Sequence, residues 1–567
     1  MAVIGIDLGT TNSLACVWKD SRPVMIKNSL GIITTPSVVG VDEDDNIIVG
    51  EVARERLISH PGKTASEFKR TLGTKQSYKL GEHSFSPEQL SSLVLNKIKE
   101  DAESFLGEKI TEAVISVPAY FDDCRRNATK QAAELSGLKV ERLINEPSAA
   151  ALAYMQQHGF EDGTYMVIDF GGGTLDVSMI DSFDSVMEIL AVAGNNKLGG
   201  KDFNNAIYEC FLEENGLTDD SLTAEQKASI YKTAEACKIA LSDMPVSIMS
   251  VNINDKNYSL KLDNNSLIKI AHTVFEKIGE PVKRVLRDSH MNISEVKEII
   301  LVGGSCKMPT VAAYIDKLTG RKPYTGIDPD TAIAVGAGIF AGMKDRNMDF
   351  KDVILTDICP FSLGTSVQDR RTMEQIMDFI IQRNSMLPSS KTHDYYAASD
   401  NQTSVRVTIY QGESIMPSNN IKLGELILDC PPTPIGEFIA SVKLTYDING
   451  ILVVDVTTSD KKTSSKVILS ESNNMTEEQL ARSREQLDKL RLASPEEEKY
   501  KLLIARAERI IEETLSFERQ VITNALQDYK SCLIAGNDRD IRIMTKKFAR
   551  FLDQLEGIDT GLADEDM

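Results

Sequence analysis

Residues 1 to about 350 alternate hydrophobic runs with amphipathic stretches. AVISVPAY, at 113–120, is typical of a buried strand, and DDCRRNATKQAAELSG, at 122–137, has the spacing of a helix that ends at a glycine. AVGAGIFAG, at 334–342, predicts a helix of small residues that either approaches a nucleotide or packs tightly against backbone. Strands that alternate with helices predict an α/β fold for this region.

The pattern changes near residue 350. KDVILTDICP, at 351–360, is a short apolar segment between charged flanks, and short β-rich stretches follow it up to about residue 475. They include SVRVTIYQGE at 404–413, KLGELIL at 422–428 and FIASVKLTYDINGILVVDVTT at 438–458. The DING sequence at 447–450 predicts a hairpin, and PPTPIG at 431–436 predicts a loop. This region is therefore expected to be an all-β domain.

After residue 475 the pattern is helical. TEEQ at 476–479 and SPEE at 494–497 both fit capping boxes, the second with proline at the first helical position. KYKLLIARAERIIEETL, at 499–515, predicts a long amphipathic helix, and the chain ends in the acidic tail GLADEDM at 561–567.

Composition narrows the function classes. The 567 residues suffice for about three or four domains, and the net charge of −21 argues against nonspecific binding to nucleic acid or to an anionic membrane. The eight cysteines form no CxxC pair, and the N-terminus does not resemble a signal peptide, so reduced thiols in a cytoplasmic protein are expected. No apolar run approaches the ~20 residues of a membrane helix. The six histidines lack ligand spacing, which argues against a zinc site.

Three glycine-rich segments each follow a strand-like run: VIGIDLGTTNS at 3–13, DFGGGTLDV at 169–177 and IILVGGSCKMP at 299–309. Glycines let backbone N–H groups approach a phosphate, threonines add hydroxyls, and the acids of the first two segments suit Mg²⁺ held through water. Because the first two segments share one design, they predict two related halves that face each other across one triphosphate.

Two other phosphate motifs are excluded. GNNKLGGKD, at 194–202, has the wrong glycine spacing for a P-loop, and an acid follows its lysine where Ser or Thr is required. DFGGGTLDV is expected to return as a second strand, whereas a dinucleotide motif opens a helix.

The motifs GIDLGTTNS, ISVPAYFDD, INEPSAAALAY, DFGGGTLDV, LVGGS, VILTD and IYQGE occur in this order. Together they resemble the heat-shock-seventy family of DnaK-like chaperones, strongly up to about residue 475 and weakly beyond. The glycine motifs alone are shared with actins and sugar kinases, whereas the full set with the β domain is specific. DICPFSLG, the VILTD segment and the short C-terminal region are most similar to the HscC-type branch.

The resemblance implies four parts. They are an α/β actin-like ATPase domain of the duplicated ribonuclease-H-like fold at 1–350, an interdomain linker at 351–360, a β-sandwich peptide-binding domain at 361–475, and a helical lid with an acidic tail at 476–567. Hydrolysis of ATP to ADP and phosphate would switch peptide affinity through the linker. The implied cofactors are ATP or ADP with Mg²⁺, and K⁺ as an optional ion. The implied partners are unfolded or apolar peptide segments, a J-domain co-chaperone and an optional nucleotide exchange factor, with no nucleic acid or membrane, and the protein is expected to be a monomer.

Matching motif by motif, the resemblance assigns roles to individual residues. The catalytic set is Lys69, Glu146, Asp169 and Thr174, and the acids that hold Mg²⁺ largely through water are Asp7, Asp169 and Asp176. The nucleotide-binding set is Gly9, Thr10, Thr11, Asn12, Gly171, Gly172, Gly173, Gly199, Gly200, Glu235, Lys238, Ser242, Gly303, Gly304, Ser305, Lys307 and Asp330. Without the family, Lys69 is more typical of a solvated lysine and Glu146 of an acid at a helix start.

The resemblance also implies residues for coupling and for substrate. The coupling set is Pro118, Arg126 and Asp357, the J-domain docking set is Arg142, Asn145 and Ser148, and the peptide-cleft set is Tyr395, Ala398, Val405 and Val407. A plain sandwich core is the alternative explanation for the two valines.

The chain departs from the family pattern at several of these places. Ile239 and Lys307 stand where prominent members place an arginine on each face of the adenine, which predicts weaker nucleotide binding, because guanidinium planes stack on rings better. Lys201 replaces an acid that is usual after LGG. Thr365 and Gln368 are polar where common members are apolar, which predicts a shifted peptide preference.

Two other functions use the same ATPase fold. A sugar-kinase-like phosphotransferase would need a sugar cleft within the first 350 residues, and an actin-like filament protein would polymerise with nucleotide. Neither function requires residues 361–567.

Overall fold

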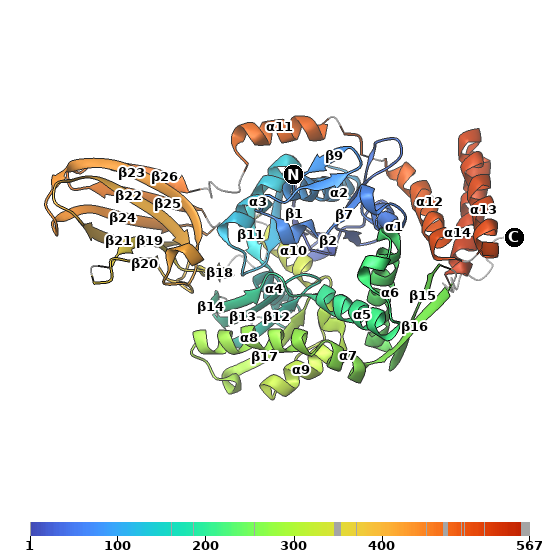
Figure 1. The fold of residues 1–567 in the computed structure, drawn as a ribbon, viewed down its shortest axis with the longest axis horizontal. Helices are drawn as coiled ribbons and strands as arrows, with labels where there is room; N and C mark the ends of the chain where they lie inside the picture. Colours follow the sequence, from blue (N-terminus) through green and yellow to red (C-terminus); the bar gives the residue numbers. More distant parts are fainter. Residues whose placement is uncertain are drawn as a thin grey trace.

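The computed structural model describes residues 2–159, 161–184, 186–254, 256–344, 353–369, 371–448, 451–468, 475–488, 490–492, 494–514 and 516–556 (Figure 1). Figure 1 shows a central two-lobed α/β region, with a β-sandwich on one side and the helices α12–α14 on the other. No helix among these residues combines the length and the apolar character that a membrane span requires.

The first lobe is built on a mixed sheet in the order β11-β10-β1-β2-β3, with β4 paired to β2. Its strands are β1 (Val3–Asp7), β2 (Asn12–Lys19), β3 (Arg22–Met25), β4 (Thr34–Pro36), β10 (Glu112–Val117) and β11 (Lys139–Asn145). Its helices are α1 (Glu51–Ser59), α2 (Pro87–Leu106), α3 (Asp123–Leu135) and α4 (Glu146–His158), and short strands complete it: β5 (Val38–Val41), β6 (Ile47–Val49), β7 (Thr64–Ser66), β8 (Tyr78–Leu80) and β9 (His83–Phe85).

The second lobe is built on a sheet in the order β17-β12-β13-β14-β18. Its strands are β12 (Gly163–Phe170), β13 (Leu175–Phe183), β14 (Val186–Asn195), β17 (Val296–Val302) and β18 (Ile354–Thr356), with a separate hairpin of β15 (Val246–Ile253) and β16 (Lys256–Asp263). Its helices are α5 (Gly200–Glu214), α6 (Ala224–Asp243), α7 (Asn264–Ile270), α8 (His272–Asp288), α9 (Pro309–Thr319) and α10 (Ala332–Lys344).

The two sheets repeat one arrangement. In each, a hairpin (β1 with β2, β12 with β13) continues into a third antiparallel strand, and the free edge of the first strand pairs with a parallel strand, β10 or β17. The DFGGGTLDV segment therefore connects two strands of a hairpin and does not open a helix, as the sequence predicts.

Helix α10 joins the lobes by close packing. A Cβ atom added at Gly5 of β1 would lie 2.2 Å from the backbone of Ala337, and one added at Gly336 would lie 1.8 Å from the Ala149 carbonyl oxygen of α4. Of the two explanations that the sequence leaves open for this small-residue helix, tight backbone packing therefore holds.

The β-sandwich consists of two four-stranded sheets, in the orders β20-β19-β22-β23 and β21-β24-β25-β26. The strands are β19 (Leu363–Gln368), β20 (Gln375–Ile381), β21 (Ser389–Tyr396), β22 (Gln402–Gln411), β23 (Ile421–Thr433), β24 (Phe438–Tyr446), β25 (Leu452–Thr458) and β26 (Thr463–Ile468). The predicted hairpin joins β24 to β25, although residues 449 and 450 lie outside the described residues. The predicted loop at 431–436 is wrong in its first half, because residues 431–433 extend β23.

The C-terminal helices are α11 (Glu477–Asp488), α12 (Pro495–Glu513), α13 (Ser516–Ala535) and α14 (Asp538–Leu555). Both predicted capping boxes form: Thr476 and Gln479 exchange hydrogen bonds, and so do Ser494 and Glu497. Helices α12–α14 share an apolar core around Tyr529, which stacks on the Phe548 ring at 4.6 Å. The acidic tail at 561–567 lies outside the described residues.

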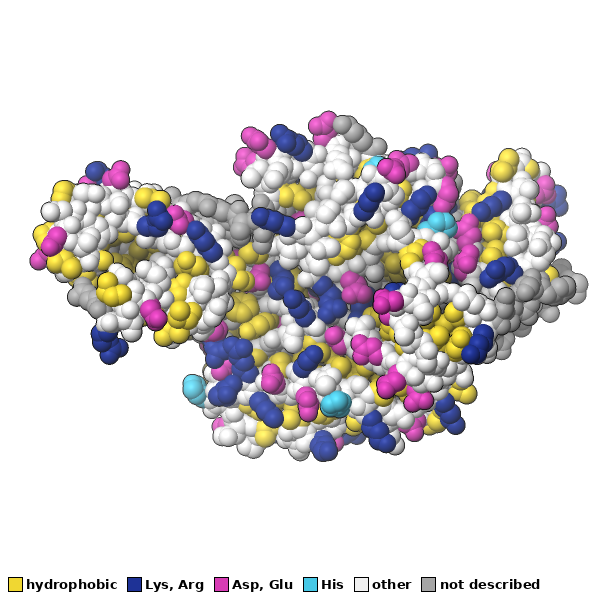
Figure 2. Space-filling view, in the orientation of Figure 1, with side chains coloured by type: hydrophobic (Ala, Val, Ile, Leu, Met, Phe, Trp, Pro, Cys, Tyr) yellow, Lys and Arg dark blue, Asp and Glu magenta, His cyan; other side chains and the backbone are white. Residues whose placement is uncertain are grey.

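The surface carries both signs of charge. On the face drawn in Figure 2, basic and acidic side chains are interspersed over both lobes and the β-sandwich. All eight cysteines are free thiols in this structure.

Candidate active site

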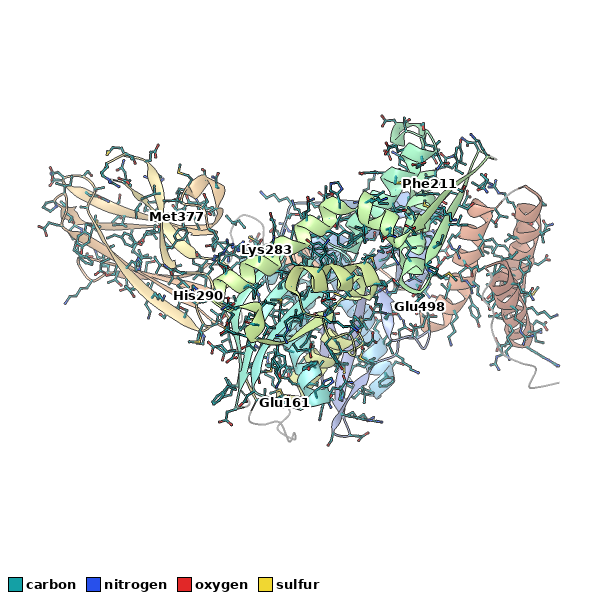
Figure 3. All side chains as sticks on the ribbon, turned by 90° about the horizontal axis from the view of Figure 1, so that it is seen from below. Glu161, Phe211, Lys283, His290, Met377 and Glu498 are labelled. Atoms are coloured by element: carbon teal, nitrogen blue, oxygen red, sulfur yellow. The ribbon has the colours of Figure 1, made fainter. Side chains whose placement is uncertain are left out.

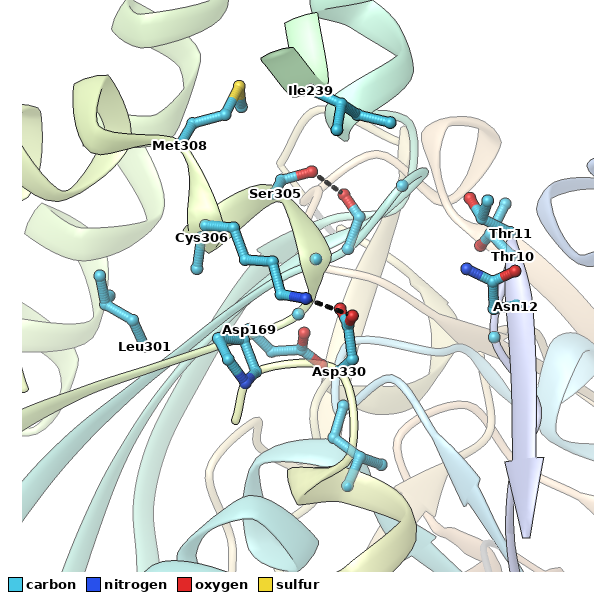
Figure 4. A pocket seen from close by; sticks show the side chains of 18 of the residues that line it. Thr10, Thr11, Asn12, Asp169, Ile239, Leu301, Ser305, Cys306, Met308 and Asp330 are labelled. Atoms are coloured by element: carbon cyan, nitrogen blue, oxygen red, sulfur yellow. Dashed lines mark hydrogen bonds and ion pairs between the residues drawn. The ribbon is translucent and has the colours of Figure 1, made fainter. Parts of the chain in front are cut away.

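A cavity of about 880 Å³ lies between the two lobes, and all three predicted glycine segments line it (Figure 4). Figure 4 shows Thr10, Thr11 and Asn12 of the first lobe facing Asp169, Ser305 and Asp330 of the second lobe across the cavity. The predicted residues that line it are Asp7, Gly9, Thr10, Thr11, Asn12, Lys69, Glu146, Asp169, Gly171, Gly172, Thr174, Glu235, Lys238, Ser242, Gly303, Gly304, Ser305, Lys307 and Asp330.

The two hairpin turns meet so closely that side chains would not fit between them. A Cβ atom added at Gly172 would lie 2.1 Å from Thr11 Oγ1, and the Gly171 N–H donates to the Thr174 carbonyl oxygen at 3.0 Å to close its turn. The glycines thus leave the backbone of both turns exposed to the cavity, where N–H groups suit phosphate.

Four predicted residues lie behind the cavity wall and do not line it: Gly173, Gly199, Gly200 and Asp176. A Cβ atom added at Gly199 would lie 2.3 Å from the backbone nitrogen of Gly173, and the Gly200 N–H donates to the Gly171 carbonyl oxygen at 3.0 Å. Gly199 and Gly200 therefore pack against the glycine loop from behind.

Lys69 and Glu146 form a buried ion pair on the cavity wall, with Lys69 Nζ 2.8 Å from Glu146 Oε1. Burial alone would lower the pKa of Lys69, but the carboxylates of Glu146 and Asp7 outweigh it, so the pKa is raised and the ammonium stays charged. Lys69 is therefore not the solvated lysine that its local sequence suggests, but a fixed positive charge inside the cavity.

Buried carboxylates cluster at the cavity wall and just behind it. Burial and the nearby Glu146 raise the pKa of Asp7 to about 7 and that of Asp176 to about 7, and they also raise the pKa of Asp169. Such a cluster is stabilised by a cation. Among the described residues no group of three or more His, Cys, Asp or Glu side chains is arranged to hold a metal directly. A hydrated Mg²⁺ needs only one or two carboxylates beside phosphate, and the carboxylates at this wall fit that requirement.

The opposite end of the cavity is formed by α6 and the segment that follows β17. Lys238 Nζ donates to the Gly200 carbonyl oxygen at 3.1 Å, and burial lowers the pKa of Lys238 to about 8. Lys307 pairs with Asp330 at 2.5 Å, and Ile239 stands at the rim with 58% of its surface exposed. The two departures from the family pattern thus face this end of the cavity, one as an exposed aliphatic group and the other held by an acid.

The family model described as Hsp70 protein matches residues 3–81 and 75–535. The chain belongs to the Hsp70 family. This family consists of chaperones, and its members are ATPases that bind ATP or ADP with Mg²⁺. The duplicated sheets, the β-sandwich and the helical C-terminal part agree with the fold that the family implies.

In this Hsp70 the predicted coupling and J-domain residues meet at one linker carboxylate. Asp357 accepts from Arg142 Nη2 at 3.1 Å, from Asn145 Nδ2 at 3.1 Å and from Ser148 Oγ at 3.3 Å. Arg126 completes the network, because its Nη2 donates to Asn145 Oδ1 at 2.7 Å. Just before Asp357, strand β18 pairs in parallel with β14, so that the segment predicted to be the linker extends the sheet of the second lobe.

The remaining coupling residue lies beside this network. Pro118 is buried directly after β10, and its carbonyl oxygen accepts from the Phe121 N–H at 3.1 Å. Arg126 Nε donates to the carbonyl oxygen of the same Phe121 at 3.1 Å. The turn between β10 and α3 therefore connects Pro118 to Arg126 and, through Asn145, to the linker.

The predicted peptide-cleft residues occupy different environments. Val405 and Val407 are buried in the apolar cluster of the sandwich, whereas Ala398 is exposed. Tyr395 is half-buried and donates from its hydroxyl to Asp378 Oδ2 at 2.7 Å. Burial and this hydrogen bond raise the pKa of Tyr395, so the hydroxyl stays protonated.

Sequence reasoning missed the contacts between the parts of the chain. The β-sandwich docks on the lobes through Arg383 Nη2, 2.9 Å from Asp288 Oδ1, and through a hydrogen bond from Tyr446 to Asp123. Each pair joins positions far apart in the sequence, and no motif spacing marks them.

Proposed function

We propose that this Hsp70 is an ATP-dependent chaperone in which hydrolysis in the inter-lobe cavity switches the affinity of the β-sandwich for exposed apolar peptide segments. In this proposal residues 1–350 are the ATPase domain, 351–360 the linker, 361–475 the peptide-binding domain and 476–567 the lid and tail. The observation that carries the proposal is the linker: its carboxylate is bound by Arg142, Asn145 and Ser148 while its strand extends the ATPase sheet.

The chemistry follows from fixed charges around the cavity. Phosphoryl transfer depends mainly on positioning and on neutralisation of charge. Lys69 would stabilise negative charge on the transferred group, Glu146 would orient the attacking water, and the hydroxyl of Thr174 would hold a phosphate oxygen. Asp7, Asp169 and Asp176 would hold Mg²⁺ through water, and the ion supplies further neutralisation of the phosphates when bound. The Lys69–Glu146 pair fixes the two side chains relative to each other.

The position of the lid supports a state of fast peptide exchange. Figures 1 and 3 place α12–α14 on the opposite side of the lobes from the β-sandwich, and Figure 3 shows Glu498 where α12 meets the first lobe. Glu498 Oε2 lies 3.0 Å from Lys97 Nζ of α2, and Lys501 Nζ lies 2.6 Å from Asp42 Oδ2. With its lid held there, the β-sandwich is open to peptides, and we assign this arrangement to the ATP-bound form.

The partner and the branch are part of the same proposal. Of the predicted docking set, Asn145 and Ser148 are buried against Asp357. The J-domain would therefore contact the face around Arg142, next to the linker that it has to sense. We also assign the chain to the HscC-type branch and to the cytoplasm, as a monomer, with a nucleotide exchange factor as an optional partner.

The test is single-turnover ATP hydrolysis by the purified full-length protein, with and without an unfolded-peptide mixture and a J-domain. Either addition is expected to accelerate hydrolysis, and Lys69→Ala is expected to slow it by at least about 100-fold while nucleotide still binds. Lys75→Ala, a change at an exposed lysine of the same lobe, serves as the matched control. Hydrolysis that is indifferent to peptide and to the J-domain, but that depends on a sugar, would refute the chaperone cycle in favour of a kinase.

A further inference from the structure

Two ion pairs of opposite polarity cross between the lobes beside the glycine loop. Lys201 Nζ, at the start of α5, lies 2.5 Å from Glu67 Oε1 of the first lobe. Arg70 Nη2 of the first lobe lies 3.9 Å from Asp202 Oδ2 of the second. Each lobe therefore offers one acid and one base to the other lobe, and we call these four residues the clasp.

Both sides of the clasp rest on the same phosphate-facing loop. The Lys201 N–H donates to the Gly172 carbonyl oxygen at 3.1 Å. From the other lobe, the Arg70 side chain packs over Gly173, where an added Cβ atom would lie 3.1 Å from Arg70 Cδ. The clasp thus closes around the loop whose residues Gly171 and Gly172 line the cavity.

The clasp also continues directly into the turn that carries Lys69. This turn is the short 3₁₀ helix Phe68–Thr71, and the residue before it, Glu67, has φ 63° and ψ 9°. Residues other than glycine rarely adopt this left-handed conformation, and strained backbone persists where surrounding contacts fix it. Here the Glu67 carboxylate is fixed by Lys201, and the Glu67 carbonyl oxygen accepts from the Arg70 N–H at 3.0 Å.

We propose that the clasp closes the phosphate end of the cavity, slows nucleotide release, and positions the Lys69 turn against the glycine loop. This inference rests on the proposed ATP site. Because residues of both lobes line the cavity, release of a nucleotide requires the lobes to separate, and separation breaks both ion pairs. Lys201, with 11% of its side chain exposed, and Glu67, with 32%, are partly shielded from solvent, so their attraction is less screened than that of a surface pair.

Charge reversal tests the clasp. The release of fluorescent N-methylanthraniloyl-ADP is measured by stopped flow for the full-length wild type, Glu67→Lys, Lys201→Glu and the double reversal. Each single reversal places like charges together and is expected to accelerate release by about tenfold. The double reversal restores an attractive pair and is expected to return release to within about twofold of the wild-type rate. Single-turnover hydrolysis is expected to fall in each single variant and to recover in the double variant.

A control and a milder pair of variants keep the result decisive. Lys109→Glu breaks the Lys109–Glu103 pair, which lies within the first lobe, and is expected to leave release unchanged. If a reversed variant does not fold, as judged by its thermal melting, Glu67→Gln and Lys201→Gln remove the attraction without adding repulsion, and each is expected to accelerate release by about threefold.

The outcomes separate the clasp from the ATP site. Release rates that the single variants leave unchanged, or a double variant whose effects simply add, would overturn the clasp while the ATP site stands. Failure of the wild type to bind the labelled ADP at all would overturn the ATP site and the clasp with it.

Discussion

Docking of the β-sandwich on the lobes is expected to weaken as pH rises through about 7, because of Asp123 of α3. This residue is buried where the sandwich meets the first lobe: Tyr446 donates a hydrogen bond to its Oδ1, and its N–H donates to Gln411 Oε1 at 3.1 Å. Its Oδ2 is buried with no hydrogen-bond partner among the described residues. Burial raises the pKa of Asp123 to about 7, and the Tyr446 hydroxyl and the Arg126 charge only partly oppose this.

The size of the effect on the docking free energy follows from the change in the pKa of Asp123. When the domains separate, water reaches Asp123 and its pKa returns towards the ordinary value of 3.8. The difference between 3.8 and about 7 corresponds to about 4 kcal/mol. Because the docked form has the raised pKa, it binds the proton more tightly, so docking is favoured at low pH. This contribution is complete below about pH 3.8 and is lost as pH rises through about 7, with a change of up to about tenfold per pH unit in the docking equilibrium.

The assay is energy transfer between one dye on the β-sandwich and one on the first lobe, both insensitive to pH, recorded from pH 5 to 8. The transfer efficiency of the wild type is expected to fall as pH rises. Asp123→Asn, which mimics the protonated acid, is expected to stay docked with a flat profile, whereas the control Asp316→Asn, at an exposed acid of α9, is expected to follow the wild type. If wild type and Asp123→Asn had the same pH profile, another group would control docking and the reasoning would be refuted.

Three further predictions concern the linker, the lid and the nucleotide. Asp357→Ala removes the acceptor shared by three donors and is expected to reduce peptide stimulation of hydrolysis by at least about fivefold, with basal turnover unchanged in a single-turnover assay. Glu498→Gln leaves the buried Lys97 ammonium with Asp101 as its one ion-pair partner among the described residues. It is expected to destabilise lid docking by about 1–3 kcal/mol, visible as faster hydrogen exchange in α12; unchanged exchange would contradict it. Ile239→Arg offers the adenine a guanidinium plane and is expected to tighten ADP binding about threefold in titration calorimetry. An unchanged affinity would show that residue 239 does not stack on the adenine.

Local chemistry is what the sequence revealed by itself. Glycine, threonine and aspartate at short spacing determine a tight turn with exposed N–H groups, so DFGGGTLDV identified its hairpin and its cavity without knowledge of the fold. The two capping boxes could also be predicted from the sequence, because each is closed by residues three positions apart. The loop predicted at 431–436 failed because prolines at the end of an edge strand are compatible with strand geometry.

The tertiary structure alone decided which distant charges meet. Lys69 looks like a solvated lysine until the first lobe folds and places Glu146 beside it, and nothing local pairs Glu67 with Lys201 or Lys97 with Glu498. Such pairs depend on how lobes, sandwich and lid pack, and packing depends on apolar faces and backbone approach far from the charges themselves. Burial then gives these groups their altered pKa values, because desolvation is a property of the folded surroundings and not of the residue or its neighbours in the chain.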